Sequence, residues 1–564
     1  MTDGQHAPFL SGSSGSQLPE KVAIAIFLLM LLVIVGGNTL ANFSAYNFHE
    51  ELRILYHLDP ARTNSKDYAG QFLSEFPQPF LYLFLTKAAI SAGVDLITFH
   101  KLLGIVCGVL LLAGAAVSGW RVGGAMVAVV TTVFIAAQPI YHYQLSSATP
   151  HAFAFPLLIW ALVCLLYDRS YLLAGLTILS GLLYPPVSPV LGLTLAWHIV
   201  VTQKGLSGHN PDRIANVLVI ACTAAISLAL LWHQITPIEG YGATLRPGEQ
   251  IGIYPENGPD GRHFDGVFNP LRYVFYVAIG QLHESLPVLI IIGVPICIVA
   301  VAGLGLNSFR NQAEFFRPLL SFIIPSVMFC ALVTQLAPYV AYRFLLYPMF
   351  TILPLLFVFG LFTLCYNHRS TSGYPAAVIV AIMVPLVLAL SGTHAYSTSA
   401  RLRLDEPSSE LMDYLQQLPA DSLIAAWPRG PQTSLIPYVA GRPLLVNYKA
   451  HYPTYEGYIT NMRTRMFDLI DAYLAQDLRP LIDLRCRWQA DFLVVDRTHF
   501  PGEGVSLNYF APFNARIEKI LSTVEKPKMI LRQPPADAVV FRAGRYTVLD
   551  LALLSGGASC PERD

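Results

Sequence analysis

Acidic side chains gather in one stretch near the start of the chain, between residues 46 and 79. The stretch contains five carboxylates: Glu50, Glu51, Asp59, Asp67 and Glu75. A carboxylate at a membrane surface suits a general base that takes a proton from an acceptor hydroxyl group. Its oxygen atoms also suit a divalent cation such as Mg²⁺ or Mn²⁺, with histidine as a further ligand. The stretch is therefore either a solvated loop or the site of a catalytic carboxylate.

The composition predicts that this stretch belongs to a polytopic membrane protein. Of the 564 residues, 54% are hydrophobic and only 13% are charged, whereas a globular chain carries about 25% charged residues. Lysine plus arginine and aspartate plus glutamate balance at 36 each. A chain without net positive charge offers no electrostatic surface for nucleic acid. We therefore expect membrane lipids as surroundings and no nucleic-acid partner.

Apolar runs separate the membrane part of the chain from the rest. Residues 1–20 are polar and rich in Gly and Ser, which predicts a disordered, cytoplasmic N-terminus. The run at 22–41 is long enough to cross a bilayer, which takes about 20 apolar residues. Further apolar runs lie at 102–119, 122–140, 152–167, 171–184, 186–202, 214–235, 286–306, 318–337, 344–365 and 374–393. These runs predict an α-helical domain over residues 21–394 with about eleven crossings.

Positive charge in the connections predicts which side each loop faces, because cytoplasmic loops carry the excess of Lys and Arg. The charges that fall in alternate loops are Arg121, Arg169, Lys204, Arg213, Arg310, Arg317 and Arg369. If these loops are cytoplasmic, the loops at 42–101 and 236–285 lie on the outer side. The apolar segment 80–96 contains Lys87 and Asp95, so we expect it to lie in the outer interface without crossing.

Residues 395–564 have the composition of a soluble domain. Residues 408–419 predict a helix that begins at Ser residues, and the runs at 422–428 and 443–448 predict short strands. Residues 491–496 predict a buried strand, and residues 537–551 predict a hairpin. Strands that alternate with helices predict an outer α/β domain. The eight cysteines are scattered without C-x-x-C spacing, so neither a metal site nor a disulfide framework is predicted.

Other polar groups on the predicted outer side come from separate segments. His142 and His151 flank the second outer loop, and Arg343 lies near the outer end of a late span. Ionisable groups at the membrane boundary are costly unless they line a wet cavity, so they are site candidates. The planar guanidinium of Arg343 suits a lipid-linked phosphate.

Each candidate also has a structural explanation. Arg343 is able to extend to lipid headgroups, and His142 and His151 are able to pack at an interface and a helix start. Asp59 precedes Pro60 and suits a turn. The remaining acids suit a solvated helix face or a structural bond, so no single residue decides between the explanations.

The order of these parts resembles the GT-C superfamily of integral-membrane glycosyltransferases. The segments that carry the resemblance are the acidic loop at 49–68, FPQPFLYLFLTKAAISAG at 76–93, TPHAFAFPLLIWAL at 149–162 and PYVAYRFLLYPMF at 338–350. The resemblance implies transfer of a sugar from a polyprenyl-phosphate donor to an envelope glycan, lipid or protein. It also implies a bacterial inner (plasma) membrane, with the C-terminal domain outside the cytoplasm.

By position, the resemblance implies Asp67, Asp59 or Glu50 as the catalytic carboxylate, often helped by a divalent cation. The acidic loop contains no Asp-Asp or Asp-x-Asp; its adjacent acid pair is Glu50-Glu51, so the choice of base stays open.

The second group of residues implied by position is Arg343, His142 and His151, for binding of the donor. The alternative is a non-enzymatic polytopic membrane protein, either a transporter or flippase or a scaffold for envelope assembly. The apolar runs contain almost no charge, whereas transporters place charges near the bilayer midplane. The pattern therefore favours surface chemistry over transport.

Overall fold

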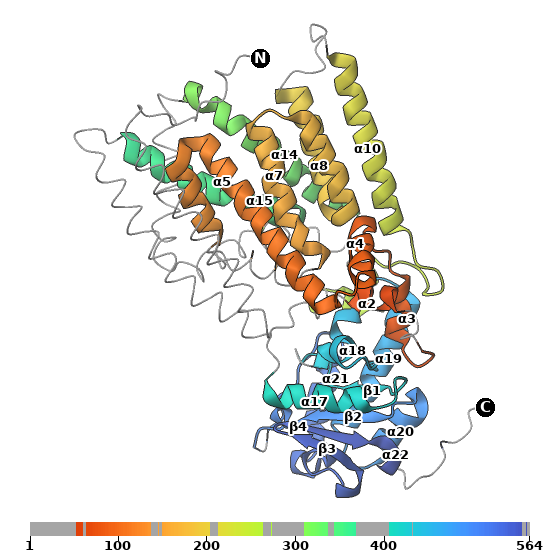
Figure 1. The fold of residues 1–564 in the computed structure, drawn as a ribbon. Coiled ribbons are helices and arrows are strands. Elements are labelled where there is room, and N and C mark those ends of the chain that lie inside the picture. Colours follow the sequence, from red (N-terminus) through yellow and green to blue (C-terminus); the bar gives the residue numbers. More distant parts are fainter. Residues whose placement is uncertain are drawn as a thin grey trace.

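The computed structural model places a bundle of long helices against a smaller α/β unit (Figure 1). The residues that it describes are 52–59, 64–136, 141, 145, 149–202, 212–246, 248–262, 272, 309–336, 343–367, 405–430, 433–502, 504–554 and 560. Three short helices lie at the junction of the two parts: α2 (Leu52–Leu58), α3 (Tyr68–Glu75) and α4 (Phe80–Ser91). The spans predicted at 22–41, 286–306 and 374–393 lie outside the described residues.

Apolar helices of the bundle follow the remaining predicted spans. They are α5 (Leu96–Ala136), α7 (Ala154–Leu166), α8 (Ser170–Leu183), α9 (Ser188–Trp197), α10 (Arg213–Ile235), α14 (Phe309–Leu336) and α15 (Arg343–Asn367). Within the described residues, Thr98–Ala125, Arg213–His233 and Phe316–Val333 are long and apolar enough to cross a membrane. With this composition, the chain is an integral membrane protein. The total of about eleven crossings stays a prediction.

Helix α5 contains the run predicted at 102–119 and the run predicted at 122–140 as far as Ala136, and it bends between them. Gly124 has φ 76° and ψ −162°, a combination that is essentially restricted to glycine. Next to the bend, Nε of Arg121 donates to the carbonyl oxygen of Leu166 at 3.3 Å. The connection between α7 and α8 therefore lies beside the bend. The two connections that contain Arg121 and Arg169, both predicted from their positive charge to face the cytoplasm, therefore lie at the same end of the bundle.

Helix α4 is the segment that the sequence predicts not to cross the membrane. It has 12 residues, fewer than the roughly 20 that a crossing needs. Its Tyr82 hydroxyl lies 3.1 Å from Nε2 of His100 at the start of α5. Nδ1 of His100 lies 3.2 Å from the hydroxyl of Tyr438 in α18 (Ile436–Val439). These bonds connect the bundle to the C-terminal unit, and the interfacial position of α4 stays a prediction.

The C-terminal unit is built on a four-stranded sheet in the order β1-β2-β4-β3. Strands β1 (Ile424–Ala426) and β2 (Phe492–Asp496) are parallel. Strands β3 (Val539–Ala543) and β4 (Tyr546–Asp550) form the predicted hairpin, and β4 pairs antiparallel with β2. The run predicted as a strand at 443–448 forms only a bridge to β1. Helices of the unit include α17 (Glu406–Gln417), α19 (Glu456–Tyr473), α20 (Arg479–Trp488) and α21 (Phe513–Thr523).

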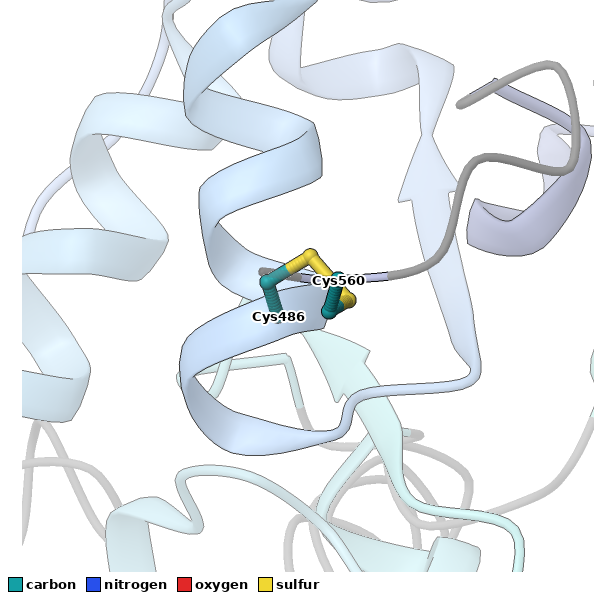
Figure 2. Close-up of a disulfide and its surroundings, with 2 residues drawn as sticks. All are labelled: Cys486 and Cys560. Atoms are coloured by element: carbon teal, nitrogen blue, oxygen red, sulfur yellow. A yellow bond between two sulfur atoms is a disulfide. The ribbon is translucent and has the colours of Figure 1, made fainter. Parts of the chain in front are cut away.

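Two details of this unit differ from the sequence prediction. Helix α17 begins one turn earlier than predicted, because Asp405 is its N-cap and accepts from the Ser408 backbone N–H at 3.1 Å. The expectation of no disulfide is wrong: Cys486 of α20 is bonded to Cys560 (Figure 2). The two cysteines are 74 residues apart in the sequence, but their Cα atoms are 5.2 Å apart. Only the fold brings them within bonding reach.

The hydrophobic core of the C-terminal unit includes residues from two distant loops. Phe72 of α3 stacks on Tyr458 of α19 with ring centroids 3.7 Å apart. Tyr241, from the long loop after α10, packs edge-on against Phe72 at 4.9 Å. Thr244 of the same loop forms an antiparallel bridge with Tyr455. The described parts of the acidic stretch, the long loop and the C-terminal unit therefore pack together. That they face the outer side of the membrane stays a prediction.

Candidate functional site

The structure brings together two of the predicted site residues, Arg343 and His151. Arg343 begins α15, and His151 lies in the short helix η4 (Pro150–Phe153). Nη1 of Arg343 donates to Nε2 of His151 at 2.8 Å. An arginine side chain only donates, so Nε2 carries no proton and the imidazole is neutral. Its proton is therefore on Nδ1, which lies 3.1 Å from Oγ1 of Thr149.

An apolar pocket opens beside this pair. The lining residues come from α7, η5 (Pro185–Val187), α9 and α15, and Arg343 is the one charged side chain among them. Tyr184 and Pro186 also line it, so the Pro-rich break in the sequence forms one wall. The ring of Tyr184 lies 5.0 Å from that of His151. A guanidinium binds phosphate oxygens in pairs, and apolar walls suit a hydrocarbon chain. The lining therefore has the chemistry of a lipid-phosphate site, in a cavity of only about 10 Å³ in this structure.

Asp67, the leading candidate for the base, lies elsewhere and is enclosed. Only 1% of the surface of Asp67 is exposed to solvent. It is the N-cap of α3, and Oδ1 accepts from the backbone N–H of Gly70 at 2.8 Å. Oδ2 accepts from the hydroxyl of Tyr56 in α2 at 2.8 Å. Both carboxylate oxygens are thus occupied by bonds that hold α2 and α3 together.

Gly70 is the residue that makes room for this arrangement. A Cβ atom at this position would lie 2.1 Å from Oδ2 of Asp67 and 2.5 Å from Cε1 of Tyr56. Atoms cannot approach so closely, so any side chain here would displace the carboxylate from its cap. The pattern Asp67-Tyr68-Ala69-Gly70 is therefore a structural unit in this fold.

Burial dominates the electrostatics of Asp67. It raises the pKa of the carboxyl group to about 6, against the opposing effects of the bonds from Gly70 and Tyr56 and of the charge on Arg465. Arg465 belongs to α19, and its guanidinium lies over the rings of Tyr68 at 5.2 Å and Trp488 at 4.6 Å. The carboxyl group therefore titrates in the weakly acidic range, between the first loop and the C-terminal unit.

The other predicted site residues are only partly described. Asp59 follows α2 directly and is exposed, and its backbone N–H donates to the carbonyl oxygen of Leu55 at 3.1 Å. Glu50 and His142 lie outside the described residues. The structure thus unites Arg343 with His151, places Asp67 in a buried junction and leaves Asp59 facing solvent.

The described residues do not provide the expected site for a divalent cation. No group of three or more His, Cys, Asp or Glu side chains among them is able to hold a metal ion. The oxygens of Asp67 accept from Gly70 and Tyr56, so they are not directed at a ligand. Mg²⁺ or Mn²⁺ therefore stays a prediction that concerns Glu50 and its neighbours, and no reaction step below depends on a metal.

The sequence analysis did not identify two residues that contribute to the pocket beside Arg343 and to the surroundings of Asp67. Tyr184 lines the pocket beside Arg343, and its signal was the Tyr-Pro-Pro break between two apolar runs. Arg465 neutralises the junction at Asp67, and it had no local signal because it lies about 400 residues further along the chain in a charged helix. Such a partner is visible only once the two segments are packed together.

Comparisons with known proteins give a distant likeness in structure. No protein-family model and no curated protein matches the sequence. The archaeal oligosaccharyltransferase AglB from Archaeoglobus fulgidus, in complex with an inhibitory peptide and a dolichol-phosphate, is 10% identical with a TM-score of 0.49, over 85% of this chain and 70% of that one. ArnT from Cupriavidus metallidurans bound to undecaprenyl phosphate is 13% identical with a TM-score of 0.49, over 94% and 98%.

A third structure, the arabinofuranosyltransferase AftD from Mycobacteria, is 13% identical with a TM-score of 0.48, over 96% of this chain and 40% of that one. AglB and AftD are glycosyl-transferring enzymes by name. Likeness of this degree assigns no activity to this chain.

Proposed function

We propose that the chain is an integral-membrane glycosyltransferase that takes a sugar from a polyprenyl-phosphate donor. The observation that carries the proposal is the pair of Arg343 and His151 beside an apolar pocket. The pair joins segments 192 residues apart, and it combines a phosphate-binding group with walls for a hydrocarbon chain. A polyprenyl phosphate has both of these parts.

In this proposal, Arg343 binds the phosphate of the donor. The bond to His151 uses one N–H of Nη1 and fixes the direction of the guanidinium plane. A guanidinium that is already held in one orientation binds phosphate oxygens with a smaller loss of side-chain freedom. As the bond between the sugar and the phosphate breaks, negative charge grows on the departing phosphate, and Arg343 stabilises it.

The proposed base is an accessible carboxylate of the first loop. Asp59 is exposed at the end of α2, and Glu50 precedes that helix in the sequence. The base takes the proton of the acceptor hydroxyl, whose oxygen then bonds to the anomeric carbon from the face opposite the phosphate. The carbon–oxygen bond to the phosphate breaks, polyprenyl phosphate leaves, and the configuration inverts. The enclosure of Asp67 by its cap bonds favours Asp59 or Glu50 over Asp67 for this role.

The outward orientation of the C-terminal unit is part of the same proposal. The disulfide between Cys486 and Cys560 supports it, because disulfides persist in oxidising compartments outside the cytoplasm. The first loop and the C-terminal unit share a core through Phe72 and Tyr458. The proposed base would therefore also lie outside, where a lipid-linked sugar donor and an envelope acceptor meet.

The test is a transfer assay in membranes that contain Arg343→Gln, with a panel of polyprenyl-phosphate sugars. We expect the rate to fall about 100-fold or more, as when one donor to a developing oxyanion is removed. Arg343→Lys keeps the charge but loses the paired geometry, so we expect an intermediate rate. Arg317→Gln is the matched control, because Arg317 is exposed in α14 and does not line the pocket.

Two results would contradict the proposal. A transfer rate for Arg343→Gln equal to that of the native chain would exclude the phosphate-binding role of Arg343. If vesicles that contain the native chain move a lipid-linked sugar from one leaflet of the membrane to the other, with no transfer to any acceptor, the flippase alternative would be supported instead.

A further inference from the structure

A second pocket lies in the C-terminal unit, away from Arg343 and His151. It is an open pocket of about 370 Å³ between the turn after β2, residues 500–502 and the segment 527–533. The volume is within the range of roughly 300–1,000 Å³ that small-molecule sites occupy. Its lining includes Arg497, Phe500, Leu531 and Arg532. The pocket is thus large enough for one or two sugar rings and has two guanidinium groups in its walls.

The position of the pocket follows from the sheet. Strands β1 and β2 are parallel, so their carboxyl ends lie at the same edge. Strand β2 ends at Asp496, and the helical turn η10 (Arg497–His499) follows at once. In α/β sheets, ligands bind in the crevice outside the carboxyl ends of parallel strands. Arg497 lies at this place.

Arg532 shapes the opposite wall of the pocket. Its Nη1 and Nη2 donate to the carbonyl oxygens of Gly502 and Gly504, so it holds the loop in place. Its guanidinium lies 5.6 Å from the centre of the Phe500 ring. Each Nη atom carries two N–H groups, and one on each remains after these bonds. Arg532 therefore has donors left for a further acceptor.

Arg497 and Arg532 differ in their ion pairing from three other arginines of the unit. Arg463 pairs with Glu256, Arg487 with Asp468 and Arg516 with Asp471. Within the described part of the chain, neither Arg497 nor Arg532 forms an ion pair with a carboxylate. Nη2 of Arg497 donates to the carbonyl oxygen of Gly544, which is a neutral partner. Two guanidinium groups that have no carboxylate partner among the described residues line one cavity, and such a pair attracts an anion.

We propose that this pocket binds a small acidic saccharide. Arg497 and Arg532 bind its carboxylate or phosphate, since guanidinium groups match the geometry of both oxyanions. Phe500, Pro527 and Leu531 form the apolar part of the lining, against which the carbon–hydrogen face of a sugar ring packs. The site is separate from the pocket at Arg343, and its ligand binding does not depend on the proposed transfer reaction.

The experiment measures binding to the purified full-length chain in detergent by isothermal titration calorimetry. The probes are glucuronic acid, glucose 1-phosphate, glucose and inorganic phosphate, at low ionic strength. We expect glucuronic acid and glucose 1-phosphate to bind, and glucose not to bind. Loss of one charged hydrogen-bond donor costs roughly 1.5–3 kcal/mol, so we expect Arg497→Gln and Arg532→Gln each to weaken binding about tenfold or more.

Controls separate loss of the site from loss of the fold. Arg479→Gln removes an exposed arginine of α20 that lies outside the pocket, and its binding should equal that of the native chain. Arg497→Gln does not touch the loop that Arg532 holds, so it tests the site if Arg532→Gln is destabilised. Equal binding of glucose, or unchanged affinity in Arg497→Gln, would overturn the proposal. Inorganic phosphate binding as tightly as glucose 1-phosphate would exclude the saccharide.

Discussion

The hydroxyl of Tyr56 donates to Oδ2 of Asp67 at 2.8 Å, and this bond joins α2 to the start of α3. The two residues are 11 positions apart, with the predicted catalytic loop between them. Arg465 belongs to the C-terminal unit, and its positive charge stabilises the ionised form of the Asp67 carboxyl group. Asp67 therefore connects the two helices on either side of the segment that follows Asp59, and the charge of Arg465, from another part of the chain, acts on its carboxylate.

The first prediction concerns the pH dependence of stability at Asp67. Burial raises its pKa from 3.8 to about 6, so between these values the folded chain binds a proton that the unfolded chain has lost. The unfolding free energy then falls as the pH rises through this window. At about 1.4 kcal/mol per pH unit, the fall amounts to roughly 3 kcal/mol.

Thermal unfolding in detergent between pH 4 and pH 7 measures this effect. Asp67→Asn has no proton to lose, and asparagine is also a good N-cap, so its unfolding temperature should vary less over this range. Asp59→Asn is the control and should keep the native pH dependence. Identical pH profiles for the native chain and Asp67→Asn would contradict the prediction.

The second prediction separates the base from the structural acid. Loss of a general base lowers a rate by about 10²–10⁴, so Asp59→Asn or Glu50→Gln should abolish most sugar transfer. Asp67→Asn should retain at least about a third of the native rate, because asparagine preserves the cap at Gly70. Initial rates of transfer from a polyprenyl-phosphate sugar in membranes distinguish the three variants. If only Asp67→Asn severely lowered the transfer rate, Asp67 would be identified as the base instead.

The third prediction concerns the core shared by the first loop and the C-terminal unit. Tyr458 lies between Tyr68 and Phe72, with ring centroids at 5.4 Å and 3.7 Å. Tyr458→Ala leaves a cavity that costs roughly 3–5 kcal/mol, so amide hydrogen exchange of residues 68–75 should accelerate. Tyr458→Phe keeps the ring but loses the bond to the carbonyl oxygen of Ala450 at 2.7 Å.

That variant, Tyr458→Phe, is the control for packing. A buried carbonyl left without its donor costs about 1–3 kcal/mol, so exchange should change less than in Tyr458→Ala. Equal acceleration in both variants would mean that the hydroxyl, and not the ring, holds the loop. No acceleration in either would show that α3 is stable without α19.

The fourth prediction concerns the disulfide. Cys486 and Cys560 close a loop of 74 residues, and a bond across such a loop stabilises the folded state by roughly 4 kcal/mol. In a chain whose other cysteines are replaced by alanine, a thiol-reactive polyethylene glycol should label intact cells only after reduction. Cys486→Ser should expose Cys560 to labelling without reductant. No labelling of intact cells even after reduction, together with labelling of lysed cells without reductant, would place the unit in the cytoplasm and contradict the prediction.

The sequence predicted elements that local patterns determine. The apolar runs correspond to helices α5, α7, α8, α9, α10, α14 and α15, because a membrane span needs a long apolar segment regardless of its partners. The strand at 491–496 and the hairpin at 537–551 also follow from local signals: β-branched residues and a Gly-containing turn. The run at 443–448 has the same local composition, but it forms only a bridge to β1. Strand formation there depends on a partner that is distant in the sequence.

The candidate site was predictable in part for the same reason. Arg343 and His151 carried a local signal, namely a polar group at the edge of an apolar run, and they meet in the structure. No local pattern distinguishes a cap from a base at Asp67, because the difference depends on how Gly70 and Tyr56 pack around it. The disulfide and Arg465 depend on contacts between segments that only the folded chain brings together.

The ion pair between Lys66 and Asp491, at 3.1 Å, spans 425 positions of the chain. A ribosome that adds about 5–20 residues per second takes roughly 20–85 s to pass from one partner to the other. During this time Phe72 and its neighbours have been made, but the surface that covers them has not. The aromatic side chains of α3 therefore stay exposed while the membrane helices insert. Binding of chaperones to these side chains, and slow maturation of the whole chain, are the expected consequences for its biogenesis.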